Sequence, residues 1–149
     1  MKSSMARTAA VAAAVLIAAA GPAGADPPKP PKSGHPILGT WSLEVPGTDC
    51  EETYFMRQDG TTLVTSGEET GQSAYEIDDE PGANGFYKST DRVTIDNGRP
   101  DCSGEVTKVG AQVVLYIKFH PSGDMMVMCQ APSLEACIGP FYRVGGEGS

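Results

Sequence analysis

The sequence predicts an all-β domain, folded either as a small antiparallel up-and-down barrel or as a two-sheet β-sandwich. Apolar and polar side chains alternate at a period of two in several short segments, most clearly in Gln112–His120. Turn signals such as Asn84-Gly85 and Asn97-Gly98 separate these segments, because Asn and Gly tolerate the backbone of tight hairpins. Beyond residue 25, apolar residues do not recur at the helical spacing of three and four over any long window.

The segments with strand character follow one another closely enough to form sequential hairpins. We expect strands at Leu38–Val45, Glu52–Gln58, Thr61–Ser66, Gln72–Ile77, Phe86–Lys88, Arg92–Asp96, Gly104–Val109, Gln112–His120, Asp124–Cys129 and Phe141–Val144. Closing such a sheet into a barrel removes exposed edges, which would otherwise pair with other chains. A sandwich accommodates the same alternation, so the period of two leaves both architectures open.

The first 25 residues have the pattern of a secretory signal peptide. Lys2 and Arg7 precede a short Ala-rich apolar run, which ends in the small residues Ala23-Gly24-Ala25. The alternative is an uncleaved anchor helix, but the run is short for a membrane span. We therefore expect an exported protein, periplasmic or extracellular, with no stable membrane insertion after cleavage before Asp26.

The predicted mature chain is strongly acidic. Residues 26–149 contain 9 basic and 19 acidic residues, for a net charge of −10. This charge excludes nucleic acid and anionic membrane surfaces as expected partners, because both would be repelled.

Two flanking segments differ in composition from the predicted β domain, which covers residues 37–144. In residues 26–36, five of eleven residues are proline, so we expect an extended polyproline-like linker outside the core. Residues 145–149 are rich in glycine and are expected to form a flexible tail.

The four cysteines of the chain predict two disulfide bonds in an exported domain of this size. Three connectivities are available to them. We favour Cys129–Cys137, which brackets a short polar loop, and Cys50–Cys102 then follows by elimination. Metal binding is disfavoured, since no C-x-x-C pair or nearby His offers ligand spacing.

The lone tryptophan carries a resemblance to a known family. Gly39-Thr40-Trp41, at the head of the first predicted strand, resembles the G-x-W motif of the lipocalins and the wider calycin group. The segment Tyr54–Gly67 also looks like the second hairpin of small bacterial lipocalin-like proteins. The resemblance implies an eight-stranded barrel whose Trp closes one end, with a basic residue of the last strand, here Arg143, packed across the ring.

No arrangement typical of catalysis is found. His120 ends a strand beside a turn signal and is expected on the surface, and the cysteines are expected to be oxidised. The acidic run Asp78-Asp79-Glu80 lacks the spacing of a calcium loop and is interpreted as a solvated turn. We therefore expect no enzymatic activity, no cofactor and no bound metal.

A methionine-rich strand suggests ligand binding. In Asp124–Cys129, Met126 and Met128 share one face, and methionine adapts to varied apolar ligands. Together with Tyr54, Met56 and Tyr116 they are our candidate ligand contacts, in a non-catalytic binding protein for a small apolar or amphipathic ligand. In the competing interpretation these methionines fill a core without a cavity.

The alternative function is an exported protein–protein interaction module, such as an inhibitor of a secreted hydrolase. A rigid loop on a disulfide-tied scaffold loses little entropy when it docks. The loop between Cys129 and Cys137, with Leu134 near its middle, would be the element presented to the partner.

Overall fold

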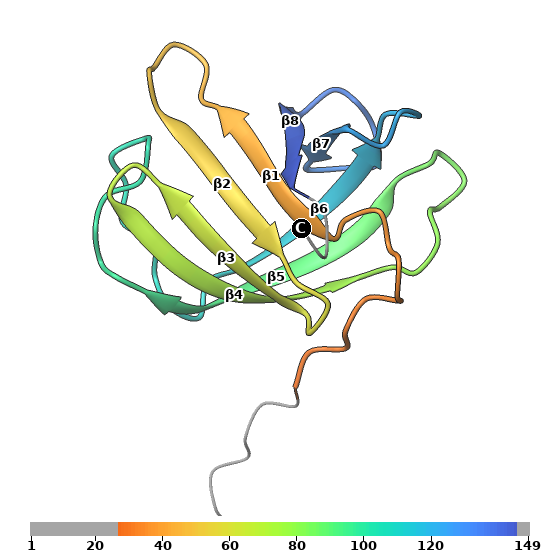
Figure 1. Cartoon of the computed structure of the whole chain (residues 1–149), viewed down its shortest axis with the longest axis horizontal. Helices are drawn as coiled ribbons and strands as arrows, with labels where there is room; N and C mark the ends of the chain where they lie inside the picture. Colours follow the sequence, from red (N-terminus) through yellow and green to blue (C-terminus); the bar gives the residue numbers. More distant parts are fainter. Residues whose placement is uncertain (1–26, 146–149) are drawn as a thin grey trace, which may run out of the picture.

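The strands of the protein form one closed antiparallel barrel, which confirms the barrel and excludes the sandwich. The computed structural model describes residues 27–145. The strands are β1 (Gly39–Glu44), β2 (Glu51–Met56), β3 (Thr61–Ser66), β4 (Glu69–Ile77), β5 (Tyr87–Asp96), β6 (Gln112–Phe119), β7 (Met125–Cys129) and β8 (Cys137–Gly145). Each strand pairs with the next along the chain, and β1 pairs with β8 to close the sheet (Figure 1). Residues 27–145 contain no apolar helix of membrane-spanning length.

Most predicted strand segments are present, and the differences have local causes. The predicted segments Phe86–Lys88 and Arg92–Asp96 both fall in or beside the continuous strand β5. The predicted strand Gly104–Val109 is wrong, because this stretch is a loop between β5 and β6. Its start is folded around Asp101, whose carboxylate accepts the backbone N–H groups of Ser103 and Glu105, so these groups are not available to a sheet.

Both predicted disulfides are present, and no described cysteine is free. Cys50–Cys102 joins the β1–β2 loop to the β5–β6 loop, across 52 residues of sequence. Cys129–Cys137 closes the β7–β8 loop, across 8 residues. Two crosslinks of this kind are compatible with an oxidising compartment.

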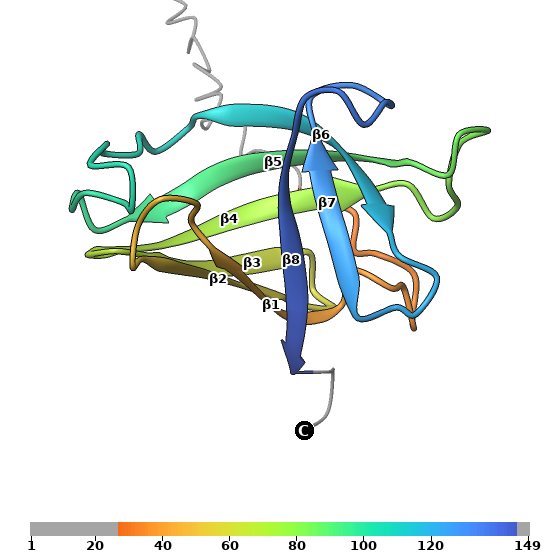
Figure 2. The same cartoon turned by 90° about the horizontal axis from the view of Figure 1, so that it is seen from above.

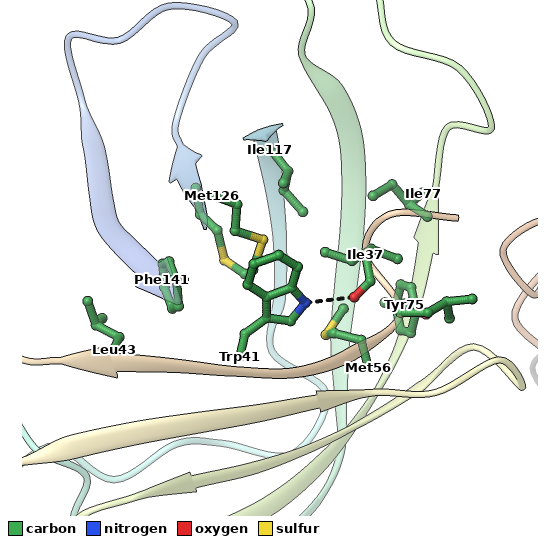
Figure 3. Close-up of a cluster of buried hydrophobic side chains, with 11 residues drawn as sticks. Ile37, Trp41, Leu43, Met56, Tyr75, Ile77, Ile117, Met126 and Phe141 are labelled. Carbon is green, nitrogen blue, oxygen red and sulfur yellow. Dashed lines mark hydrogen bonds between the residues drawn. The ribbon is translucent and has the colours of Figure 1, made fainter. Parts of the chain in front are cut away.

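The core of the barrel is built around Trp41, which is fully buried (Figure 3). Its indole Nε1 donates a hydrogen bond to the carbonyl of Ile37 at 2.8 Å. Met56, Met126 and Phe141 are buried with it in the same apolar cluster. Gly39 has a φ of +114°, a backbone conformation that residues with a Cβ rarely adopt. This explains why a glycine stands two residues before Trp41.

The expected contact between Trp41 and Arg143 is present. The guanidinium carbon of Arg143 lies 4.2 Å from the centroid of the Trp41 ring. The same guanidinium donates hydrogen bonds to the carbonyls of Leu38 at 2.6 Å, Pro36 at 2.7 Å and Gly123 at 3.1 Å. It therefore ties the β6–β7 turn and the chain before β1 to the tryptophan.

The proline-rich segment differs from the expected linker, because it packs on the barrel. We call residues 27–36 the N-terminal strap. Pro31 is buried, and the His35 side chain is only 2% exposed. Gln58 Nε2 donates to the carbonyl of Pro31 at 2.6 Å, and the backbone N–H of Lys29 donates to the Glu76 carboxylate at 2.9 Å. The prediction of a signal peptide over residues 1–25, and nearly all of the predicted tail, lie outside the described residues.

Candidate functional site

The two ends of the barrel are built from different loops. At one end, which we call the Trp41 end, the strap meets the β4–β5 loop through a hydrogen bond between His35 Nε2 and the carbonyl of Asp78. At the opposite end, the β1–β2 loop, the β3–β4 turn and the β5–β6 loop gather together (Figure 1). Figure 2 shows β7 and β8 crossing steeply over the long strands β4 and β5.

The methionines predicted to contact a ligand lie in the packed core of the Trp41 end. Met56 is 5%, Met126 1% and Met128 6% exposed, and all three belong to the buried cluster around Trp41. Tyr54 packs against this cluster, with its ring 5.6 Å from that of Phe141. The structure does not bring Tyr116 to them. It lies beside the buried Ile117 in β6, so it points to the outer face of the barrel.

A cavity of about 200 Å³ lies inside the opposite end of the barrel. We call it the acidic cavity, because five of its lining residues carry carboxylates. These are Glu52 of β2, Glu69 of β4, Asp91 and Asp96 of β5, and Asp101 of the β5–β6 loop. The lining residues that the structure describes include no Lys, Arg or His, and Tyr54 lies at the boundary with the apolar core.

The pleat of the strands explains how these side chains come to the interior. In β4 the residues at positions 69, 73, 75 and 77 are buried, so Glu69 is on the same face as the core residue Tyr75. A register shift between Gln72 and Ser73 interrupts the pairing of β4 with β5 and sets Gly71 opposite Asp96. Because Gly71 has no side chain, β5 approaches it closely: a Cβ at this position would lie 3.1 Å from the carbonyl oxygen of Ile95 and 3.5 Å from Asp96 Oδ2.

The β5–β6 loop is fixed over the cavity by covalent and polar contacts. Cys102 is tied to Cys50, and its backbone N–H donates to the Ser66 hydroxyl at 3.0 Å. Ser66 in turn donates to one oxygen of Glu52 at 2.7 Å, and the Tyr54 hydroxyl donates to the other oxygen at 2.8 Å. Both oxygens of Glu52 thus accept a hydrogen bond, and Ser66 connects Glu52 to the β5–β6 loop. Burial, together with the negative charge of Glu52, raises the pKa of the Tyr54 phenol.

Two other carboxyls of the cavity are held in surroundings that disfavour their charge. Burial raises the pKa of Asp91 to about 6, although the Ser73 hydroxyl donates to it at 3.0 Å and opposes the shift. Burial also raises the pKa of Glu69, which is 7% exposed, and the neighbouring Asp96 adds to this shift while a hydrogen bond from Thr107 opposes it. Oδ2 of Asp96 is buried and has no hydrogen-bond partner among the described residues.

This arrangement suits a ligand that brings positive charge and N–H donors. Ionised carboxylates only accept hydrogen bonds, so they cannot pair with one another when both are charged. Among the described residues, no three His, Cys, Asp or Glu side chains are grouped so that they could hold a metal ion. The volume is also below the roughly 300–1,000 Å³ of sites for drug-sized ligands, which limits the cavity to a small molecule or part of one.

An apolar groove of about 250 Å³ lies on the outside of the barrel, lined among others by Val127, Leu134 and Pro140. Leu134, in the loop closed by Cys129–Cys137, is 67% exposed. His120 lies exposed at the end of β6, as predicted, with its Nδ1 bonded to the turn residue Ser122.

The acidic cavity was not predicted from the sequence. Each carboxylate, taken alone, is typical of a solvated face. The alternation of side chains along the strands could have indicated the cavity. Glu52 is on the same strand face as Tyr54, and Glu69 is on the same face as Tyr75, so both carboxylates point to the interior. Comparison with protein-family models, curated proteins and solved structures finds no match to this chain.

Proposed function

We propose that the protein is an exported, non-catalytic binding protein for a small amphipathic ligand with a cationic amine head, held in the acidic cavity. The observation that carries the proposal is the cavity inside one end of the barrel, opposite the packed Trp41 end. The two disulfides and the signal-like N-terminus support export. The G-x-W resemblance to small lipocalin-like proteins is consistent with ligand carriage in a barrel interior.

The charge of the cavity favours an amine over other ligand classes. Two opposite unit charges about 4 Å apart attract by about 4 kcal/mol at an effective dielectric constant of about 20. No described residue of the lining supplies that positive charge. A bound ammonium group would stabilise the ionised forms of Asp91 and Glu69 and would offer a donor to Asp96 Oδ2.

The remaining lining residues favour an apolar body on the same ligand. Tyr54, Val64 and Val93 also line the cavity, on β2, β3 and β5. An apolar group of the ligand that packs against these side chains would be removed from water, which favours binding.

The first experiment is a native mass spectrum of the protein exported by its own host and purified without detergent. A covalent mass of residues 26–149 less four hydrogens is expected for the cleaved chain with both disulfides. A further non-covalent adduct that is lost on denaturation is expected, and its mass would characterise the natural ligand.

Calorimetric titration with defined probes then tests the ligand class. A series of linear primary alkylamines is expected to bind, whereas alcohols and carboxylates of the same chain lengths do not. Asp91→Asn is expected to weaken amine binding about tenfold or more, and Asp124→Asn, an equal charge change at an exposed residue outside the cavity, is the matched control. Equal binding of amines and alcohols, or equal losses in the two variants, contradicts the proposal.

A second candidate function rests on a different observation, the exposure of Leu134 on a disulfide-closed loop. Such a loop suits an interaction module, for example an inhibitor of a secreted hydrolase. The loop is held internally by a hydrogen bond from the N–H of Gln130 to the carbonyl of Ala136 at 2.9 Å. Leu134→Asp is expected to abolish capture of a protein partner and to leave amine binding unchanged, which separates the two functions.

A further inference from the structure

His35 is the buried group of the N-terminal strap, and both of its ring nitrogens are engaged. Its Nδ1 accepts a hydrogen bond from the backbone N–H of Ile37 at 3.0 Å, so that nitrogen carries no proton. Its Nε2 lies 3.1 Å from the carbonyl oxygen of Asp78, an acceptor, so the proton is on Nε2. The fold therefore specifies the neutral ring in one tautomer.

Aromatic side chains surround the rest of the ring. The rings of Tyr87 and Phe119 meet it edge to face, with centroids 5.0 Å and 6.5 Å away. Phe119 also contacts Trp41, with centroids 5.8 Å apart. His35 is thus packed, at 2% exposure, against the partly buried rings of Tyr87 and Phe119 at the Trp41 end.

Adding a proton to Nδ1 is incompatible with this arrangement. The new N–H would point at the N–H of Ile37, so one hydrogen bond is replaced by two facing donors. Ile37 would lose the acceptor of its backbone N–H. Its carbonyl accepts the indole N–H of Trp41, so the loss occurs next to the tryptophan. The strain therefore falls on the turn that joins the strap to β1.

The charged groups around the His35 ring do not offset the effect of burial on its pKa. Burial lowers the pKa of His35 below its ordinary value of 6.5, and the charge of Lys32 lowers it further. Asp79 and Glu80 of the β4–β5 loop and the hydrogen bond to Asp78 act in the opposite direction, but burial is the largest cause. The neutral form is favoured in the docked strap, so docking is complete above pH 6.5 and is lost as the pH falls through the lowered value.

The strap is also held by hydrogen bonds from Gln58 to the Pro31 carbonyl and from Arg143 to the Pro36 carbonyl, and by two ion pairs. Its ion pairs, Lys29 with Asp79 and Lys32 with Glu80, join side chains that are between 41% and 76% exposed. Exposed pairs of this kind contribute little to stability. The barrel itself is independent of them, because its strands and both disulfides lie outside the strap.

We propose that His35 is a pH-operated latch: on acidification its protonation releases the N-terminal strap and uncovers the aromatic end of the barrel around Trp41. The released state would increase the exposure of Tyr87 and Phe119, at the end opposite the acidic cavity. This inference is independent of the proposed ligand, because it concerns a different end of the barrel.

The test uses the two histidines of the chain and its single tryptophan. Quenching of Trp41 fluorescence by acrylamide is measured from pH 8 to pH 5 on the purified, disulfide-bonded protein. A reversible rise of several-fold in the quenching constant is expected in the wild type. His120→Gln, which removes the exposed histidine, is expected to keep the transition, and His35→Gln, whose amide has a donor and an acceptor but does not titrate, is expected to lose it. The same transition in His35→Gln, or none in the wild type, overturns the proposal.

Nuclear magnetic resonance of the wild type covers the case in which His35→Gln does not fold. The His35 ring is expected to show the Nε2–H tautomer at pH 8 and to titrate with the same midpoint as the amide signals of residues 29–38. A ring that titrates while those amides are unchanged overturns the proposal, as does a ring that remains neutral until the whole barrel unfolds.

Discussion

Arg143 lies over Trp41 at the seam where the barrel closes: the two residues are register partners on β8 and β1, and the guanidinium carbon is 4.2 Å from the ring centroid. The guanidinium also carries three hydrogen bonds to backbone carbonyls on two separate segments. One side chain therefore joins the first strand, the last strand, the end of the strap and the β6–β7 turn. Lysine has the charge but not the planar fork, so it would not replace this set of contacts.

We predict that Arg143→Lys lowers the free energy of unfolding by about 2–4 kcal/mol, because hydrogen bonds from a charged donor and the stacked contact are lost together. Urea unfolding followed by Trp41 fluorescence measures the change. Arg99→Lys is the control, since Arg99 makes an exposed ion pair with Glu68, and about 0.5 kcal/mol or less is expected there. Equal losses of unfolding free energy in the two variants would show that the contact between Arg143 and Trp41 contributes no more than an exposed ion pair.

Gly67 is predicted to be essential for the position of the β5–β6 loop. Its φ is +57°, and a Cβ at this position would lie 3.0 Å from the carbonyl carbon of Asp101. Gly67→Ala is expected to cost about 2–4 kcal/mol, combining backbone strain with displacement of the loop, and to weaken amine binding. Gly98→Ala is the matched control. The φ of Gly98 is +71°, but no atom lies within 4 Å of where its Cβ would be, so only backbone strain of about 1 kcal/mol is expected.

Asp91 is predicted to make the protein less stable at neutral pH than in mild acid. Its pKa is about 6 in the folded protein and near 3.8 in the unfolded chain, so the folded state binds more protons between these values. Stability therefore falls as the pH rises from about 4 to about 6, by up to about 3 kcal/mol for this group.

The variant Asp91→Asn isolates this contribution. It is expected to be more stable than the wild type at pH 7.5 and to lack the loss between about pH 4 and pH 6, even though it binds amines less well. Urea midpoints at several pH values measure both effects. If Asp91→Asn shows the same dependence of stability on pH as the wild type, other groups cause that dependence.

The two disulfides are predicted to differ in both stability and function. Cys50–Cys102 closes the longer loop, with 52 residues of separation against 8, so its removal is expected to cost about 4 kcal/mol against about 2.5 kcal/mol for Cys129–Cys137. The paired Cys→Ser variants are compared by urea unfolding and by amine titration. Loss of amine binding is expected only for the first pair, because only Cys102 lies in the loop that carries Asp101.

The sequence was sufficient for the fold because the barrel depends on local patterns. Alternation at a period of two and glycine-containing turns identified most strands, and Thr61–Ser66 was predicted with the bounds of β3. The disulfide pairs followed from the short spacing of Cys129 and Cys137. The one false strand, Gly104–Val109, contains two valines, but Val106 and Val109 are 52% and 62% exposed.

The strap and the cavity were not predictable in the same way, since both depend on contacts distant in sequence. The His35 ring is hydrogen-bonded to the carbonyl of Asp78, 43 residues away, and nothing in a proline-rich window indicates such a partner. The carboxylates of the cavity come from three strands and a loop, and closure of the barrel brings them together. The methionine stripe was visible in the sequence, but alternation does not distinguish a ligand-lined interior from the packed core that Met126 and Met128 occupy.

The separation of the Trp41 end from the acidic cavity also bears on how this protein can change during evolution. Residues that hold the fold and residues that line the cavity are different sets on the same strands, with Tyr54 at their boundary. If the cavity binds an amine as we propose, substitutions at Glu69, Asp91 or Asp96 would change its ligand preference and leave the apolar cluster around Trp41 unchanged. On that proposal, a few substitutions at one end of the barrel would exchange one ligand preference for another, while the other end keeps the chain folded.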